Sequence, residues 1–297
     1  MIQLSDFVAR GGWLFDASGG VYTLGDSPFY GSFIDQMKVD EFILSSSQYK
    51  SSGYSAVTNL GNLLIAGENK LSKNILTTSE SNLEFTRGII SGSEIALFDG
   101  DNSIYIKKLP DVLHDEYGSK VFTLSEVDRV PVCSLAFANN GEGLFVLLES
   151  GKILTFGNAQ HLGDFISENI QARAVSIAIK PWGTGYWVID SIGGVFCFGD
   201  SDYFGSIPGD GMTIESLKII SHPSGRGYYI IDSFGHVFPF GYGDTFKMDM
   251  PDSIKDLITF VPEIVEAKNE QLYGAKNITQ FLYEEIKNKK ELENNEN

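Results

Sequence analysis

The chain has 297 residues, a formal net charge of −17 and a pI near 4.6. This balance disfavours nucleic acid and anionic membranes as partners, because phosphate binding needs clustered Lys and Arg. Hydrophobic residues make up 42% of the chain and aromatic residues 12%, enough for one large core with a tail. The acidic excess is typical of a soluble protein, or of one that attracts a basic partner or cations.

The N-terminal residues, MIQLSDFVARGGW, lack the basic region and apolar stretch of a signal peptide. No apolar run in the sequence is long enough to span a bilayer. We therefore expect a cytoplasmic protein, or a virion protein made in the cytoplasm. Cys133 and Cys197 fall in expected strands of neighbouring repeats, and without an export signal we expect two buried free thiols.

The first unit reads GGWLFDASGGVYTLGDSPFYGS over residues 11–32 and predicts a β-hairpin followed by a further short strand. Its turn carries Asp16 and Gly19, which supply side-chain-to-backbone hydrogen bonds and positive φ. The expected strands are Ile2–Val8, Trp13–Asp16, Val21–Leu24 and Phe29–Phe33.

Two degenerate copies of this unit follow. Residues 53–67 match residues 11–25 at an offset of 42 and keep three glycines, and residues 94–106 match at an offset of 83. The expected first strands of these units lie near Glu41–Ser45 and Leu83–Ile90. An insertion is expected around Pro110–Lys120.

A weaker copy occupies residues 141–163, and two clear copies occupy residues 183–206 and 225–246. Their opening aromatic residues, Phe145, Trp187 and Tyr229, follow one another at intervals of 42 residues and correspond to Trp13. Six all-β units of this period, with about four strands each, predict a six-bladed β-propeller over residues 1–250. The strands expected to open or end these units are Val130–Phe137, Ala174–Lys180, Tyr203–Ser206 and Leu217–His222.

The segment from residue 251 to 297 is expected to hold a closing strand, an amphipathic helix and a polar tail. Asp256–Val261 beside the first blade, or Ile2–Val8 beside the sixth, would close the ring, and a seventh, degenerate blade is a third alternative. Beyond this strand, four apolar residues share one face of a predicted helix and are candidates for partner binding or for docking on the propeller's own rim. They are Ile278, Phe281, Leu282 and Ile286.

The repeats resemble a family of bacterial and phage β-propeller repeats written G-x-G-Y-W-x5-G-G-V-F-x-F-G-D-x4-G-S. Residues 183–206 follow this pattern almost throughout, and residues 11–32 and 225–246 follow it well, with Pro239 and Tyr242 as departures. In that family the repeats often act as non-catalytic modules, alone or attached to surface enzymes. The resemblance implies the propeller fold more directly than any one function.

The aspartates Asp16, Asp190 and Asp232 recur at one hairpin position, each followed by a glycine at Gly19, Gly193 or Gly235. They could be cation ligands, but one site needs only one copy. We therefore interpret them as structural turn residues, each bonding backbone N–H groups of its own turn.

No pattern in the sequence indicates catalysis or a cofactor. The four histidines are scattered without metal-ligand spacing, and there is no nucleophile elbow or phosphate-binding loop. We assign no catalytic, cofactor-binding or metal-binding residue and expect a protein that is not an enzyme. The aromatic pairs Phe29-Tyr30 and Tyr203-Phe204, and Tyr242, are the best candidates for a binding face, although such residues more often pack between blades.

The sequence predicts a non-enzymatic structural or interaction module with protein partners in a larger assembly. We favour a bacteriophage virion, in which the chain would be a tail or capsid accessory protein. Two alternatives stay open: a module that binds a glycan or another cell-surface ligand, and a hydrolase or lyase with carboxylates or histidines converging at the channel mouth.

Overall fold

The computed structural model describes residues 11–25, 27–49, 53–67, 70–91, 94–108, 119–125, 131–138, 143–181, 184–241 and 254–260. Over these residues the chain forms six antiparallel sheets of three or four strands, together with short 3₁₀ helices. The predicted C-terminal helix, with Ile278, Phe281, Leu282 and Ile286, lies outside the described residues. Within the described ranges, no helix combines the length and apolarity needed to cross a membrane.

Each sheet is one blade, and its strands run in order from the innermost to the outermost. Blade 1 is β20 (Ile254–Phe260), β1 (Gly11–Asp16) and β2 (Val21–Gly25); blade 2 is β3 (Ile43–Gln48), β4 (Gly53–Thr58), β5 (Asn62–Gly67) and β6 (Leu71–Asn74); blade 3 is β7 (Arg87–Ser91), β8 (Glu94–Phe98), β9 (Ser103–Lys108) and β10 (Ser119–Thr123). Blade 4 is β11 (Val132–Phe137), β12 (Gly143–Leu148) and β13 (Ile153–Gly157); blade 5 is β14 (Ala174–Ile179), β15 (Tyr186–Asp190) and β16 (Val195–Phe198); blade 6 is β17 (Ser216–Ser221), β18 (Gly227–Asp232) and β19 (Val237–Gly241).

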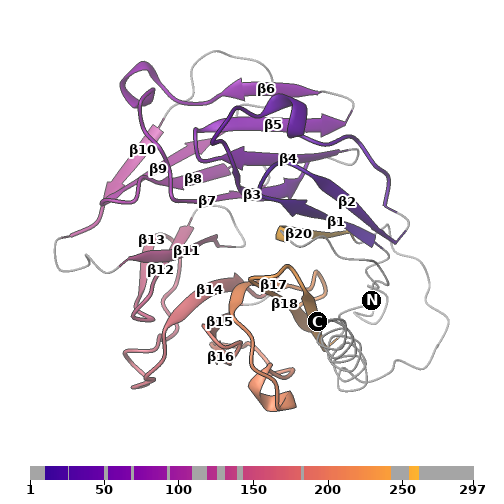
Figure 1. Ribbon diagram of the computed structural model, residues 1–297. Helices are drawn as coiled ribbons and strands as arrows, with labels where there is room; N and C mark the ends of the chain where they lie inside the picture. The colour runs from indigo at the N-terminus through magenta and orange to yellow at the C-terminus, as the bar shows by residue number, and fades with distance from the viewer. Residues whose placement is uncertain are drawn as a thin grey trace, which may run out of the picture.

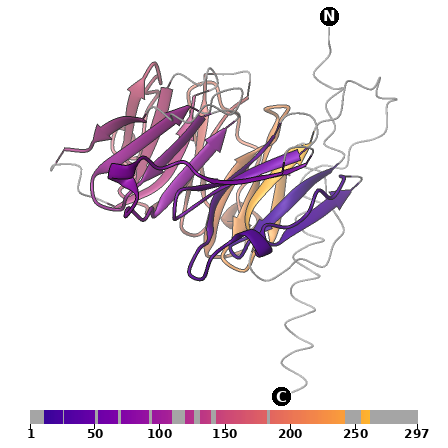
Figure 2. The ribbon, with the colours of Figure 1, turned by 90° about the horizontal axis from the view of Figure 1, so that it is seen from above.

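The six blades form a closed ring. The innermost strands β3, β7, β11, β14, β17 and β20 each contact the innermost strand of the next blade, and β20 contacts β3. Figure 1 shows these strands around the middle of the molecule with the later strands of each blade outside them, and Figure 2 shows the ring from its edge. The six-bladed β-propeller predicted from the repeats is the observed fold.

The strand register repeats with the sequence period. The first residue of the second strand and the last residue of the third are a facing pair of glycines in four blades: Gly11 and Gly25, Gly53 and Gly67, Gly143 and Gly157, and Gly227 and Gly241. In blade 3, Phe98 faces Ile104 as Phe15 faces Val21 in blade 1. The offsets of 42 and 83 therefore align equivalent positions, including those of the two degenerate copies.

The ring closes through the C-terminal strand. β20 pairs antiparallel with β1, with Gly11 opposite Phe260 and Leu14 opposite Leu257. This confirms the first of the closure alternatives; the other candidate strand, Ile2–Val8, lies outside the described residues. Leu14 of blade 1 packs directly on Tyr229 of blade 6, so no seventh blade lies between these two.

Two predicted strands are wrong. Phe29–Phe33 and Tyr203–Ser206 are irregular loops, so a fourth strand is described only in blades 2 and 3, as β6 and β10. In both loops, a backbone N–H and a backbone carbonyl form hydrogen bonds with a tyrosine hydroxyl of the following blade. The Tyr228 hydroxyl, for example, donates to the Gly205 carbonyl and accepts from the Phe204 N–H at 3.1 Å. Backbone groups bonded in this way cannot pair with the third strand of their own blade.

The opening aromatic residues of the repeats occupy equivalent buried positions. Trp13 and Trp187 lie in the middle strands of their blades, and each indole N–H donates a 2.8 Å hydrogen bond to a carbonyl fifteen residues downstream, at Pro28 and Asp202. Tyr229 is fully buried at the corresponding position of blade 6. Middle strands have two dry faces because a blade covers each side, which explains their continuous apolar runs.

The two cysteines are free, as predicted, but both are half-buried and not fully buried. Cys133 lies in β11 and Cys197 in β16. Burial raises the pKa of the Cys133 thiol to about 12 and that of Cys197 to about 11, so both stay protonated at neutral pH.

Candidate interaction face

The hairpin turns between the second and third strands of the six blades all lie on one face of the ring, which we call the turn face. In blades 5 and 6 the Asp190 and Asp232 carboxylates accept from backbone N–H groups two and four residues later, at 2.8 to 3.0 Å. Asp16 accepts from the Gly20 N–H at 2.8 Å in the same way. The following glycines, Gly19, Gly193 and Gly235, have positive φ of 90°, 83° and 89°. These groups hold the turns rigid.

Blade 2 holds its turn differently, because Thr58 stands where blades 1, 3, 5 and 6 have aspartate. The Thr58 hydroxyl accepts from the Asn62 N–H at 3.2 Å and donates to the carboxylate of Glu41 at 2.5 Å. Glu41 comes from the segment that enters the blade, is buried, and also accepts from the Asn62 amide at 2.7 Å. A carboxylate from another part of the chain thus replaces the one missing from the turn.

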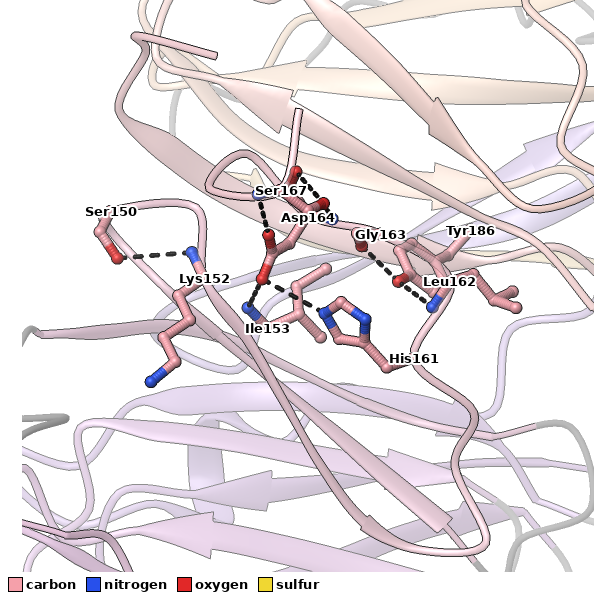
Figure 3. A network of polar contacts seen from close by, with 9 residues as sticks. All are labelled: Ser150, Lys152, Ile153, His161, Leu162, Gly163, Asp164, Ser167 and Tyr186. Atoms are coloured by element: carbon pink, nitrogen blue, oxygen red, sulfur yellow. Dashed lines mark hydrogen bonds and ion pairs between the residues drawn. The ribbon is translucent and has the colours of Figure 1, made fainter. Parts of the chain in front are cut away.

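Within the described residues, tyrosines join neighbouring blades at three junctions. The hydroxyls of Tyr54, Tyr186 and Tyr228 each donate to a glycine carbonyl of the preceding blade and accept from the N–H of the residue before that glycine. Figure 3 shows this arrangement for Tyr186 with Leu162 and Gly163. Burial raises the pKa of all three phenols, that of Tyr54 to about 12, so each hydroxyl keeps its proton and can donate. These latches fix the angle between blades.

A histidine–carboxylate pair lies beside the latch of blade 4. His161 Nε2 is 3.2 Å from Asp164 Oδ2, and the same carboxylate accepts from the N–H groups of Ile153 and Ser167 (Figure 3). Burial alone would raise the pKa of Asp164, but these bonds outweigh it and lower the pKa. Ser167 Oγ contacts the backbone of Asp164 and not the imidazole, so the group is a loop clamp and not a nucleophile–base pair.

A channel of about 820 Å³ runs between the innermost strands and is lined mainly by serine and aliphatic residues. Its charged lining residues are Arg87, Glu149, Arg173, Glu215 and Lys218. Arg173 pairs with Glu149 at 3.7 Å, and the Arg87 guanidinium donates to the carbonyls of Thr86 and Cys133. Among the described residues, the lining contains no histidine, and no three His, Cys, Asp or Glu side chains gather as a metal site.

Large apolar side chains are exposed on the turn face. Ile192 and Phe234 stand at the third position of their hairpin turns, 46% and 65% exposed. In blade 1 the same turn position holds Ser18, with the same carboxylate-to-backbone bond from Asp16. The turn geometry therefore does not require an apolar residue there. Further exposed apolar residues lie in the segments next to these turns: Ile34, Val39, Phe42 and Ile166.

The predicted aromatic pairs split between packing and exposure. Tyr30 and Phe204 pack in the blade junctions, against the rings of Tyr54 and Tyr228 at 5.7 Å between centroids. Phe29 and Tyr203 are exposed on the outer rim. Tyr242, like the helix residues predicted to bind a partner, lies outside the described residues. Sequence analysis did not single out Ile192 and Phe234, although comparison of the aligned turns with Ser18 could have done so.

No known protein family matches the chain, and no curated protein has a significantly similar sequence. Among solved structures, a chain of the crystal structure of a nidogen/laminin complex is similar with a TM-score of 0.56 and 11% identity, over 83% of this chain and 97% of that chain. A chain of the crystal structure of the mitotic checkpoint complex has a TM-score of 0.50 and 11% identity, over 84% and 81%. At this identity the likeness shows a shared fold alone.

Proposed function

We propose that this propeller is a non-enzymatic interaction module that binds other proteins of a larger assembly through its turn face. The observation that carries the proposal is the exposure of Ile192 and Phe234 at a turn position where Ser18 serves equally well. Large apolar side chains that are exposed together on one face of a protein are typical of sites of association.

The turn face suits binding because it is rigid. Its turns are held by buried carboxylates, and its blades are held by tyrosine latches. A preorganised surface loses little conformational freedom on association, and each large apolar side chain fully buried contributes about 1.5–3 kcal/mol. Both similar structures come from protein complexes, which supports an interaction role without naming a partner.

The assembly that we propose is a bacteriophage virion, with the chain as a tail or capsid accessory protein. Its support is the resemblance of the repeats to bacterial and phage propeller repeats. Mass spectrometry of purified particles should detect the chain in stoichiometric amounts, and particles that lack it would contradict this part of the proposal.

The interaction role is tested by the double variant Ile192→Ser/Phe234→Ser, which copies the turn residue of blade 1. In size-exclusion chromatography of native extracts, the wild-type chain should elute with the assembly and the double variant as a monomer. Phe29→Ser is the matched control, because it removes an equally exposed aromatic residue from the outer rim. An unchanged elution of the double variant, or equal release of the control, would contradict the proposal.

A further inference from the structure

Acidic side chains lie beside the exposed apolar residues of the turn face. Val39 and Phe42 flank Asp40, an exposed aspartate, and the nearby segment from residue 34 to 42 contains one cation, Lys38, against three acids. The three acids are Asp35, Asp40 and Glu41, of which Glu41 is buried by its own bonds. Exposed apolar and acidic groups therefore alternate along this segment.

Glu215 stands in the same way between the turn tips of blades 5 and 6. The Ser216 N–H donates to the Ser191 carbonyl at 3.1 Å, and the Ser233 N–H donates to the Glu215 carbonyl at 2.8 Å. These two bonds tie the backbone at residues 215 and 216 to both turns. Ile192 follows Ser191 and Phe234 follows Ser233, so the exposed Glu215 lies between the two apolar tips.

The charges of these acids are not matched within the described part of the chain. There, no ion pair joins the carboxylates of Asp40 and Glu215 to a cation, whereas the nearby Arg173 is already paired with Glu149. The apolar–acidic arc, which we define as Val39, Asp40, Phe42, Ile192, Glu215 and Phe234, therefore presents negative charge together with apolar surface. A second copy of this chain would bring like charge against it, and so would nucleic acid or an anionic membrane.

We propose that the apolar–acidic arc binds a segment of another protein in which Lys or Arg side chains alternate with apolar ones. This inference rests on the proposed function and adds the chemistry of the partner. Apolar side chains of the segment would cover Ile192, Phe234 and Phe42. Its cations would face Glu215 and Asp40, where complementary charge contributes to selectivity and to the rate of association.

The probe is a displayed library of random peptides, selected against the full chain and counter-selected against Ile192→Ser/Phe234→Ser. The selected peptides are then measured by fluorescence anisotropy against Asp40→Lys/Glu215→Lys. The matched control is Asp101→Lys, which reverses an exposed acid on the same face but outside the arc. We expect peptides that combine Lys or Arg with apolar residues, and an affinity loss of about tenfold or more in the charge-reversed variant. That loss should shrink in high salt.

The outcomes separate this inference from the proposed function. Peptides that need Ile192 and Phe234 but are neutral or acidic, or that bind the charge-reversed variant equally well, would overturn the partner chemistry and leave the interaction face intact. An equal loss of affinity in Asp101→Lys would show that the peptides respond only to the overall negative charge of the protein. That result would also overturn the proposed partner chemistry. A selection that yields no peptide dependent on Ile192 and Phe234 would overturn the proposed function itself.

Discussion

Blades 1, 3, 5 and 6 hold their hairpin turns with one kind of hydrogen bond, and blade 2 holds its turn with another. In the former, a turn aspartate bonds its own backbone, as Asp190 does. In blade 2, a buried glutamate from the connecting segment does comparable work, because Glu41 bonds Thr58 and Asn62 of the turn. A second buried glutamate, Glu80, makes an ion pair away from the turns, with the fully buried Lys107 of β9 at 2.7 Å. A repeat that loses its motif can therefore keep its shape if a charge from outside the repeat replaces the missing bond.

Removing one partner should lower the free energy of unfolding more at the buried Glu80–Lys107 ion pair than at a local hydrogen bond. A local hydrogen bond that is lost leaves a neutral group, whereas a buried ion pair that is broken leaves an uncompensated charge. The following predictions test that difference, in order of expected size.

The largest effect is expected at Lys107. Lys107→Met should lower the free energy of unfolding by about 3–5 kcal/mol, because it leaves the Glu80 carboxylate buried without its cation. Urea denaturation at pH 7 measures the loss. The double variant Lys107→Met/Glu80→Gln, in which no charge is stranded, should recover much of it, and a loss below about 1 kcal/mol in the single variant would contradict the comparison.

A second test uses His222, an ionisable group buried in a motif-rich blade. Burial lowers its pKa from 6.5 to about 4, and Nδ1 lies 2.6 Å from the Ser224 hydroxyl. The unfolded chain takes up the proton first as the pH falls. The stability contribution of the neutral imidazole is thus complete above pH 6.5 and is lost between there and pH 4, to a total of about 3 kcal/mol.

The pH effect is measured as the difference between the wild type and His222→Phe in urea denaturation from about pH 8 to about pH 4. Taking this difference cancels the titration of carboxylates that both proteins share. Parallel stability curves for the two proteins would show that His222 is not held neutral by burial.

The smallest effects are expected at the latches. Tyr54→Phe, Tyr186→Phe and Tyr228→Phe should each cost about 1–2 kcal/mol, because each removes one hydroxyl that makes two hydrogen bonds. The three losses should be similar, since the latches are geometrically equivalent. Tyr30→Phe, whose hydroxyl is not part of a latch, is the control and should change stability by less than about 0.5 kcal/mol. Widely unequal losses would show that the latches are not equivalent.

The sequence was sufficient to predict the blades but not their edges. The 42-residue spacing of the opening aromatic residues was the main guide to the units, and the structure adds that Gly11, Gly53, Gly143 and Gly227 mark the same register position in four blades. The short strand expected at Tyr203–Ser206 did not form, because its backbone bonds to Tyr228, twenty-odd residues away in the next blade. Local propensity carries no information about such a contact.

The residues of the candidate interaction face could be predicted from the sequence only in part. The role of Glu41 depends on Thr58 and Asn62, which no spacing rule connects to it. Ile192 and Phe234 fall inside turns that the sequence marks by Asp190 and Asp232, but their exposure is seen only in the structure. The choice of closing strand was left open for a similar reason, since both chain ends contain a segment with strand character.

The pairing of β20 with β1 has a consequence for how the molecule is made. On the ribosome, the earliest blade to emerge stays incomplete until almost all of the propeller has been synthesised, and β1 meanwhile has an open edge that could recruit a wrong neighbour. In a chain released before residue 254, the edge of β1 would stay unpaired. Such truncated chains should aggregate, and adding residues 254–260 as a separate peptide should reduce the aggregation. This result would show that the last strand of the propeller protects the edge of the first blade.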